Sequence, residues 1–186
     1  MKKSFAITVA VLLSSMLYLV GVCGAGDPVT KPFKAQWSGA DYAVGPCLDP
    51  DPNLPPGAFQ VLNVGKGVAT ITGESEFVSV SCSAFTSATF AVSSGWMILT
   101  AANGDKLHIR IEGTLNLATG EWTEEEWTVG GTGKFKNATG YSESGGKIIF
   151  PTDPDLFPFD ANPAIKPGLL AEPTYWVGKT NGYITY

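Results

Sequence analysis

The chain has 186 residues with a formal net charge of −5, and this length predicts one folded domain. Its 22 glycines and 13 prolines predict frequent turns, while 44% hydrophobic and only 16% charged residues exclude a disordered, charge-rich protein. The acidic balance lacks the basic surface on which nucleic-acid binding depends, so no nucleic-acid partner is expected.

The first 25 residues have the pattern of a secretory signal peptide. Two lysines follow Met1, an apolar run covers residues 5–22, and small residues at positions 24 and 25 suit signal peptidase. We expect cleavage after Ala25 and an exported domain over residues 26–186, periplasmic or secreted, without stable membrane insertion. A retained membrane anchor is one alternative, and lipid attachment at Cys23 in a lipobox-like segment is the other.

Cleavage would leave two cysteines, Cys47 and Cys82, in an oxidising compartment. An even pair of thiols in an exported domain predicts a structural disulfide. Metal binding would need a C-x-x-C pair or several histidines, and His108 is the only histidine in the sequence. Neither a metal nor another cofactor is expected.

The rest of the chain has the pattern of an all-β domain with long Pro-rich loops. Short runs rich in β-branched and aromatic residues alternate with turn motifs, and none shows the apolar period of a long helix. An antiparallel sheet is therefore expected, with Pro-rich segments over residues 43–57 and 151–173. The expected strands cover residues 33–37, 59–64, 68–72, 76–82, 86–92, 96–101, 107–115, 121–129, 147–150 and 174–186.

Asn103-Gly104 is the strongest turn motif in the sequence. These residues favour a two-residue type I′ turn because both tolerate positive φ. Pairing about such a turn places Ile98 opposite Ile109, and a symmetric loop over residues 116–120 extends the same face to the next strand. The predicted inner face, which is also the candidate ligand-binding surface, consists of Trp96, Ile98, Leu107, Ile109 and Trp127.

The same pairing gathers five ionisable side chains on the opposite face, which we expect to face solvent. A histidine flanked by carboxylates and an arginine suits general acid–base catalysis or anion recognition, so this face is the alternative, polar site. Solvated faces of antiparallel sheets commonly carry such charges, and no catalytic residue is assigned. The five are His108, Arg110, Glu112, Glu124 and Glu126.

Residues 130–141 read Gly-Gly-Thr-Gly-Lys-Phe-Lys-Asn-Ala-Thr-Gly-Tyr. They lack the spacing of a phosphate-binding loop, and no amphipathic helix follows them. The segment resembles the Gly-Gly-Thr-Gly-x-Phe motif, ending in Ala-x-Gly, of dirigent and allene oxide cyclase-like β-barrels, particularly the exported bacterial members. Residues 65–70, 100–105 and 112–114 are similar to the same group.

This resemblance covers about residues 60–145 and the end of the chain, and it implies a single antiparallel eight-stranded barrel. In plant relatives the lumen guides cyclisation or radical coupling of small apolar molecules, but none of the family's catalytic positions is matched here. We expect non-catalytic binding of a small apolar ligand or an envelope partner in or near the barrel. A cyclase or isomerase acting in the lumen is the alternative, and a purely structural barrel is the third hypothesis. An oligomer is compatible with the sequence.

Overall fold

The structure is a computed structural model that describes residues 27–149 and 173–186. The predicted signal peptide, the alternative lipid attachment at Cys23 and nearly all of the Pro-rich excursion predicted over residues 151–173 lie outside the described residues. The elements in chain order are β1 (Thr30–Pro46), β2 (Phe59–Ala69), β3 (Gly73–Phe85), β4 (Phe90–Thr100), β5 (Lys106–Asn116), β6 (Glu121–Gly131), the 3-10 helix η1 (Gly133–Phe135), β7 (Thr139–Ile149) and β8 (Thr174–Thr185).

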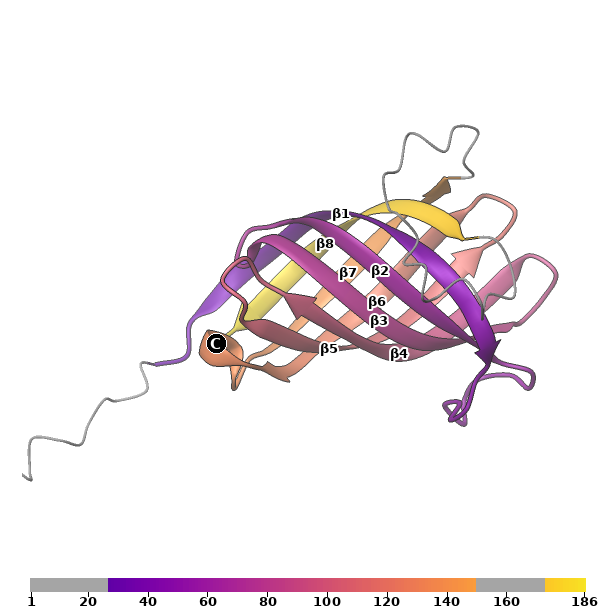
Figure 1. Ribbon diagram of the computed structural model, residues 1–186, viewed down its shortest axis with the longest axis horizontal. Helices are drawn as coiled ribbons and strands as arrows, with labels where there is room; N and C mark the ends of the chain where they lie inside the picture. The colour runs from indigo at the N-terminus through magenta and orange to yellow at the C-terminus, as the bar shows by residue number, and fades with distance from the viewer. Residues whose placement is uncertain (1–26, 150–172) are drawn as a thin grey trace, which may run out of the picture.

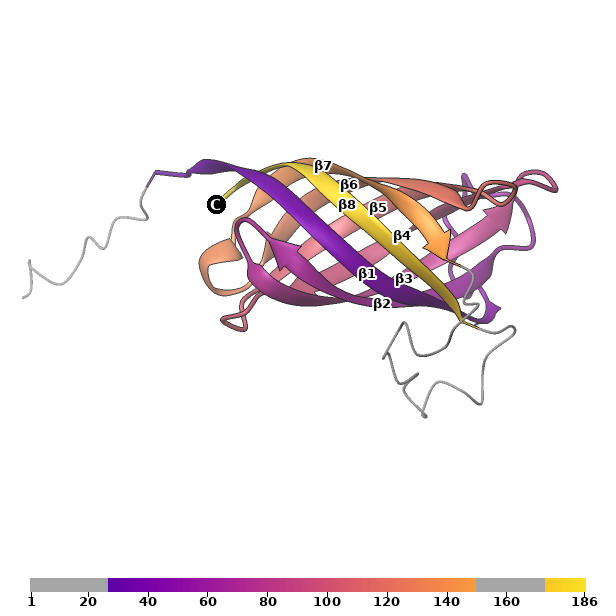
Figure 2. The same ribbon diagram turned by 90° about the horizontal axis from the view of Figure 1, so that it is seen from above.

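The eight strands close into one antiparallel barrel (Figure 1, Figure 2). Each strand pairs with its neighbours in sequence, and β8 completes the sheet by pairing with β1 from Thr30 and Thr185 to Asp41 and Thr174. Closure satisfies both edges of the sheet with backbone hydrogen bonds. The predicted fold class, an all-β single antiparallel eight-stranded barrel, is confirmed.

Several expected short runs merge into longer strands. β2 contains the run 59–64 and the start of the run 68–72, because the glycines between them lie within the strand. A Cβ on Gly65 would lie 2.5 Å from the Phe77 ring, and one on Gly67 would overlap the carbonyl oxygen of Gln36. Glycine is needed here for close approach of neighbouring groups to the backbone, not for a turn.

One half of the barrel, which we call the packed half, is filled by apolar side chains. It lies at the end that carries η1 and the C-terminus (Figure 1). η1 directs Phe135 into this end, where its ring centroid lies 5.2 Å from that of Tyr186. Fully buried side chains stabilise the fold by about 1.5–3 kcal/mol each. The largest in this half are Phe33, Leu99, Leu107, Ile109, Phe135 and Ile184.

The turn between β4 and β5 differs from the predicted two-residue turn. Gly104 has a φ of +86°, but Asn103 keeps a negative φ, and its side-chain oxygen accepts a hydrogen bond from the Asp105 N–H at 3.1 Å. The Ala101 N–H donates to the Asp105 carbonyl, which closes a loop of residues 102–104. One additional loop residue shifts the register by one position.

This shift turns every side chain of β4 to the other face. Leu99, not Thr100, pairs with Leu107. Trp96 and Ile98, which were predicted to point inward, are 58% and 46% exposed on the outer face. The prediction for β5 is correct, since Leu107 and Ile109 are both buried.

The loop between β5 and β6 also differs from its predicted length, because it is one residue shorter than the predicted loop over residues 116–120. The loop has four residues, 117–120, because Asn116 pairs directly with the first residue of β6. The side chains of β6 therefore also lie on the opposite face from the one predicted. Trp127 lies outside the barrel, opposite an arginine, whereas Glu124 and Glu126 point into the lumen and not to solvent.

Cys47 and Cys82 form the predicted disulfide, with their Cα atoms 5.6 Å apart. The bond joins the loop that follows β1 to the last third of β3, at the end of the barrel opposite the packed half. A disulfide is consistent with an extracellular or periplasmic location, because such compartments are oxidising.

Candidate ligand-binding site in the barrel

The other half of the barrel, which we call the hollow half, contains a cavity of about 550 Å³. This volume lies within the range of about 300–1,000 Å³ that is typical of small-molecule sites. All eight strands contribute inward-facing side chains to it. One residue from each strand, in chain order, is Asp41, Asn63, Ser79, Met97, Leu115, Glu124, Ser144 and Trp176.

Small side chains explain why this half is not filled. Beyond Phe77 the next inward positions of β3 are Ser79, Ser81 and Ser83, and β5 contributes Gly113. Protein interiors are otherwise close-packed, so replacing large apolar side chains by serine leaves open volume. The serine hydroxyls also make this part of the wall polar.

Four aromatic side chains, which we call the aromatic wall, form a connected row along the cavity. Trp37 meets Phe77 edge-on with ring centroids 5.6 Å apart, and Phe77 stacks on Trp176 at 5.8 Å. Trp176 in turn meets Trp122 edge-on at 5.3 Å. These contacts hold large, rigid apolar surfaces against the cavity.

Three carboxyl groups, which we call the acidic cluster, also line the cavity. Asp41 comes from β1 and pairs in register with Asn63 of β2. Glu124 and Glu126 occupy alternate positions of β6 and therefore share its inner face. The two strands lie on different sides of the barrel, so the carboxyl groups converge on the cavity from two walls.

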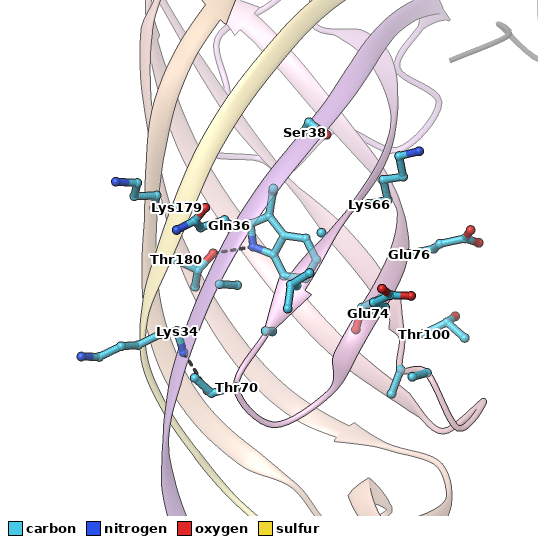
Figure 3. A pocket seen from close by; sticks show the side chains of 18 of the residues that line it. Lys34, Gln36, Ser38, Lys66, Thr70, Glu74, Glu76, Thr100, Lys179 and Thr180 are labelled. Atoms are coloured by element: carbon cyan, nitrogen blue, oxygen red, sulfur yellow. Dashed lines mark hydrogen bonds between the residues drawn. The ribbon is translucent and has the colours of Figure 1, made fainter. Parts of the chain in front are cut away.

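A chain of hydrogen bonds holds Glu126, which is 4% exposed. The Trp37 indole N–H donates to the Thr180 hydroxyl at 2.8 Å, the bond drawn at Thr180 in Figure 3. Thr180 lies 2.5 Å from the Ser144 hydroxyl, which donates to one oxygen of Glu126, while Ser142 donates to the other at 2.7 Å. Because both oxygens accept hydrogen bonds, Glu126 is fixed in position.

Burial raises the pKa of every member of the acidic cluster. It raises the pKa of Asp41 to about 7, against a smaller opposing effect of the Trp176 N–H. Burial, together with the charges of Glu126 and Asp41, raises the pKa of Glu124 to about 8. Burial also raises the pKa of Glu126, although its two serine donors oppose the shift. Asp41 and Glu124 are thus poised to exchange protons near neutral pH.

Four buried polar atoms along the cavity have no hydrogen-bond partner within the described residues. They are Oδ1 of Asp41, Oδ1 of Asn63, and the indole nitrogens of Trp122 and Trp176. Buried polar atoms are nearly always hydrogen-bonded in folded proteins. The cavity therefore presents two acceptors and two donors that a bound molecule can satisfy, although the Trp176 N–H also acts on the Asp41 carboxyl group and opposes the rise of its pKa without forming a regular hydrogen bond.

The predicted inner face does not form this site. The five residues predicted to bind ligand, Trp96, Ile98, Leu107, Ile109 and Trp127, do not line the cavity. Leu107 and Ile109 belong to the packed half, and the other three lie outside the barrel. These residues were predicted to bind ligand because they are apolar, and apolar character does not distinguish a filled core from the wall of a cavity.

The predicted polar site is divided between the two faces of the sheet. His108, Arg110 and Glu112 lie on the outer face, as predicted, where Arg110 pairs with Glu112 and its guanidinium lies 5.0 Å from the Trp127 ring centroid. The Arg110 and Glu112 side chains are 47% and 41% exposed, so this pair is a weak surface contact. Only the two glutamates of β6 reach the lumen.

The predicted site residues do not include Asp41, Asn63, Trp122 or Trp176. One pattern could have revealed part of the site: Trp122, Glu124 and Glu126 alternate, so a large aromatic residue shares a face with two carboxylates. Such a face suits a polar lumen as well as solvent. Asp41 and Asn63 carry no comparable pattern.

A second hollow of about 1,450 Å³ is lined by β8, β1, β2, β3 and the end of β4, and its lining includes both outward-facing charged residues and buried residues such as Trp37 and Thr180 (Figure 3). Figure 3 shows Lys34 and Lys179 pointing to one side of this surface and Lys66, Glu74 and Glu76 to the other. Charges of both signs that diverge into solvent do not focus on a common ligand atom. The cavity in the hollow half is therefore the stronger candidate site.

Comparison of the sequence with family models and with curated proteins finds no match. Within residues 27–149 and 173–186, no three His, Cys, Asp or Glu side chains are grouped to hold a metal ion. No helix in the same two segments has the length and apolarity needed to cross a membrane. The candidate site is accordingly defined by the chemistry of its lining.

Proposed function

We propose that the protein is an exported, non-catalytic barrel that binds a small, largely apolar molecule in its hollow half. The observation that carries this proposal is the cavity of about 550 Å³, with its aromatic wall and unpartnered polar atoms. Small-molecule sites typically combine extensive apolar surface with a few placed polar groups. Here the aromatic wall supplies the first, and the unpartnered atoms fix the orientation of the ligand.

Two observations support export. The pattern of residues 1–25 is typical of a signal peptide, and the Cys47–Cys82 disulfide suits an oxidising compartment. We expect the intact mass of the mature protein to match a chain that starts at Gly26. A diacylglycerol adduct on Cys23 would establish lipid anchoring instead, and a mass including residues 1–25 would contradict cleavage.

The resemblance to dirigent and allene oxide cyclase-like barrels supports binding inside the lumen. A cyclase or isomerase is the second candidate function, because the raised pKa values leave Asp41 about half protonated and Glu124 mostly protonated at neutral pH. Such groups can donate a proton to an apolar substrate held against the aromatic wall. Asp41 and Glu124, with pKa values of about 7 and 8, are the groups that this function would use.

Mass spectrometry of small molecules extracted from purified protein tests the proposal. Ser81 points into the cavity, whereas its neighbour Val80 is 43% exposed on the outer face. Ser81→Phe should therefore reduce the amount of co-purified compound several-fold, and the matched Val80→Phe variant should retain it. Equal retention by the two variants would place any bound compound outside the barrel.

The identified compound then separates the two functions. It should be recovered unchanged after incubation with the protein if the barrel only binds. Conversion to an isomer with a different chromatographic retention time, abolished in Glu124→Gln, would instead favour the cyclase or isomerase.

A further inference from the structure

We propose that the ligand of the hollow half is an organic cation, in which an ammonium group is carried on an apolar body. This inference rests on the proposed function, because it names the chemical class of the molecule bound in the same cavity. It goes beyond the expectation of a merely apolar ligand.

The first argument is an imbalance of charge. The cavity is lined by Asp41, Glu124 and Glu126, and no Lys, Arg or His stands among its described lining residues. Arg110 and His108 lie on the outer face of β5, so they cannot form hydrogen bonds within the acidic cluster. Buried carboxylates without a positive partner are strongly unfavourable, and a bound cation would supply that partner.

The second argument is the pair of unpartnered acceptors at the acidic cluster; the other two unpartnered atoms of the cavity are the indole N–H groups of Trp122 and Trp176. Oδ1 of Asp41 and Oδ1 of Asn63 are both acceptors, and they lie on paired residues of β1 and β2. An ammonium N–H can donate to both, whereas an anionic ligand would be repelled. Glu126 already accepts hydroxyl hydrogen bonds at both oxygens, so Asp41 and Glu124 remain to meet the cation.

The third argument is the aromatic wall beside these carboxyl groups. The ring centroids of Trp122 and Trp176 lie 5.3 Å apart in an edge-to-face contact, Phe77 stacks on Trp176, and all three aromatic side chains border the cavity. Organic cations bind over aromatic faces through the ring quadrupole, most strongly over tryptophan. A cavity of about 550 Å³ also accommodates a molecule much larger than a bare ion.

Cation binding should be coupled to proton release. Asp41 and Glu124 have pKa values raised to about 7 and about 8, so both are largely protonated at pH 5.5, whereas at pH 8.5 Asp41 is almost fully ionised and Glu124 is about three-quarters ionised. The other titratable groups facing them do not alter this sign: Glu126 belongs to the cluster, and the pKa of neighbouring Tyr42 is raised further above neutrality. Affinity for a cation should therefore increase as the pH rises through this range.

A matched pair of probes tests the inference. Phenethylammonium carries N–H donors and stays positively charged from pH 5.5 to pH 8.5, and propylbenzene is its neutral isostere with a methyl group in place of the ammonium group. Both are titrated against the full mature protein by tryptophan fluorescence, since Trp122 and Trp176 border the cavity. At pH 8.5 we expect the cation to bind about ten-fold more tightly, equivalent to about 1.4 kcal/mol, and the ratio should approach one at pH 5.5.

Variants locate the effect. Asp41→Asn with Glu124→Gln should remove the preference for the cation while leaving binding of the neutral isostere within about two-fold. Glu112→Gln removes the same charge from the outer face of the barrel and should leave the preference intact. The comparison of the two probes on the unmodified protein does not depend on the folding of any variant.

The outcomes separate this inference from the function on which it rests. Equal affinity for the two probes at pH 8.5, or a preference that survives the double substitution, would overturn the cation inference while leaving lumen binding in place. Binding of neither probe, together with no co-purified molecule, would overturn both.

Discussion

The packed half and the hollow half of the barrel are built from the same eight strands but filled in different ways. On β5, Leu107 and Ile109 are fully buried at one end, whereas Gly113 and Leu115 border the cavity at the other. On β3, the inward positions change from Phe77 to serines. The difference shows that strand pairing can close the barrel without close packing along its whole interior. One half can therefore provide stability while the other leaves room for a ligand.

The largest difference between the halves should appear when the same substitution is made twice on β5. Leu107→Ala removes a fully buried side chain from close packing and should destabilise the fold by about 2–5 kcal/mol. Leu115→Ala enlarges an existing cavity and should destabilise it by only about 1 kcal/mol. Denaturant unfolding measures both values, and equal losses would contradict the division into two halves.

The disulfide should compensate for the weaker packing of the hollow half. It closes a sequence separation of 35 residues, for which the chain-entropy relation gives about 3–4 kcal/mol. We expect this loss of unfolding free energy in the Cys47→Ser, Cys82→Ser double variant. Its effect on local opening should concentrate in β1 and β3 near residues 47 and 82, which hydrogen exchange can resolve. Uniform loss of protection would show that the disulfide acts on the whole barrel instead.

The acidic cluster should make the free protein less stable at higher pH. The pKa values of Asp41 and Glu124 are raised on folding, so the folded state holds protons that the unfolded state has released. Stability is therefore full below the unfolded pKa values near 4 and is lost as the pH rises through 7 and 8. We expect a decrease of at least about 2 kcal/mol between pH 5 and pH 8.

Glu124→Gln should flatten this pH dependence and stabilise the free protein at pH 8. Denaturant unfolding of both proteins across pH 5–8 gives the measurement, and Glu112→Gln on the outer face is the matched control. A decrease of the same size in Glu124→Gln would show that other groups dominate the pH response.

The fold could be predicted from the sequence because its main features are local. Strand-forming runs, glycine and proline punctuation and the absence of helical periodicity indicate an antiparallel all-β domain, and the segment at 130–141 indicated the barrel. The Cys47–Cys82 pairing followed because the expected cleavage after Ala25 removes Cys23 and leaves only two cysteines. These features do not depend on the exact pairing of any two residues.

The site could not be predicted, because which face points inward depends on loop length to the single residue. Asn103 uses its side chain to bond the Asp105 N–H and keeps a negative φ, so the loop has three residues and not two. The four-residue loop after Asn116 changes β6 in the same manner. Each error of one residue in loop length exchanges the inner and outer faces of a whole strand. This exchange on β6 is why Glu124 and Glu126 are found inside the barrel.

The smallest expected effect tests this corrected register directly. Ile98 is 46% exposed on β4, and its neighbour Leu99 is 1% exposed inside the packed half. Ile98→Thr keeps a β-branched side chain at an exposed strand position, so it should change the unfolding free energy by less than about 0.5 kcal/mol. Leu99→Thr places a hydroxyl in a closely packed apolar region and should destabilise the fold by several-fold more. With a two-residue turn at Asn103-Gly104, Ile98 would instead lie opposite Ile109 in the core, and the order of the two effects would be reversed. Denaturant unfolding of the two variants therefore determines which face of β4 is inside, and with it whether β4 contributes Met97 or Trp96 to the interior.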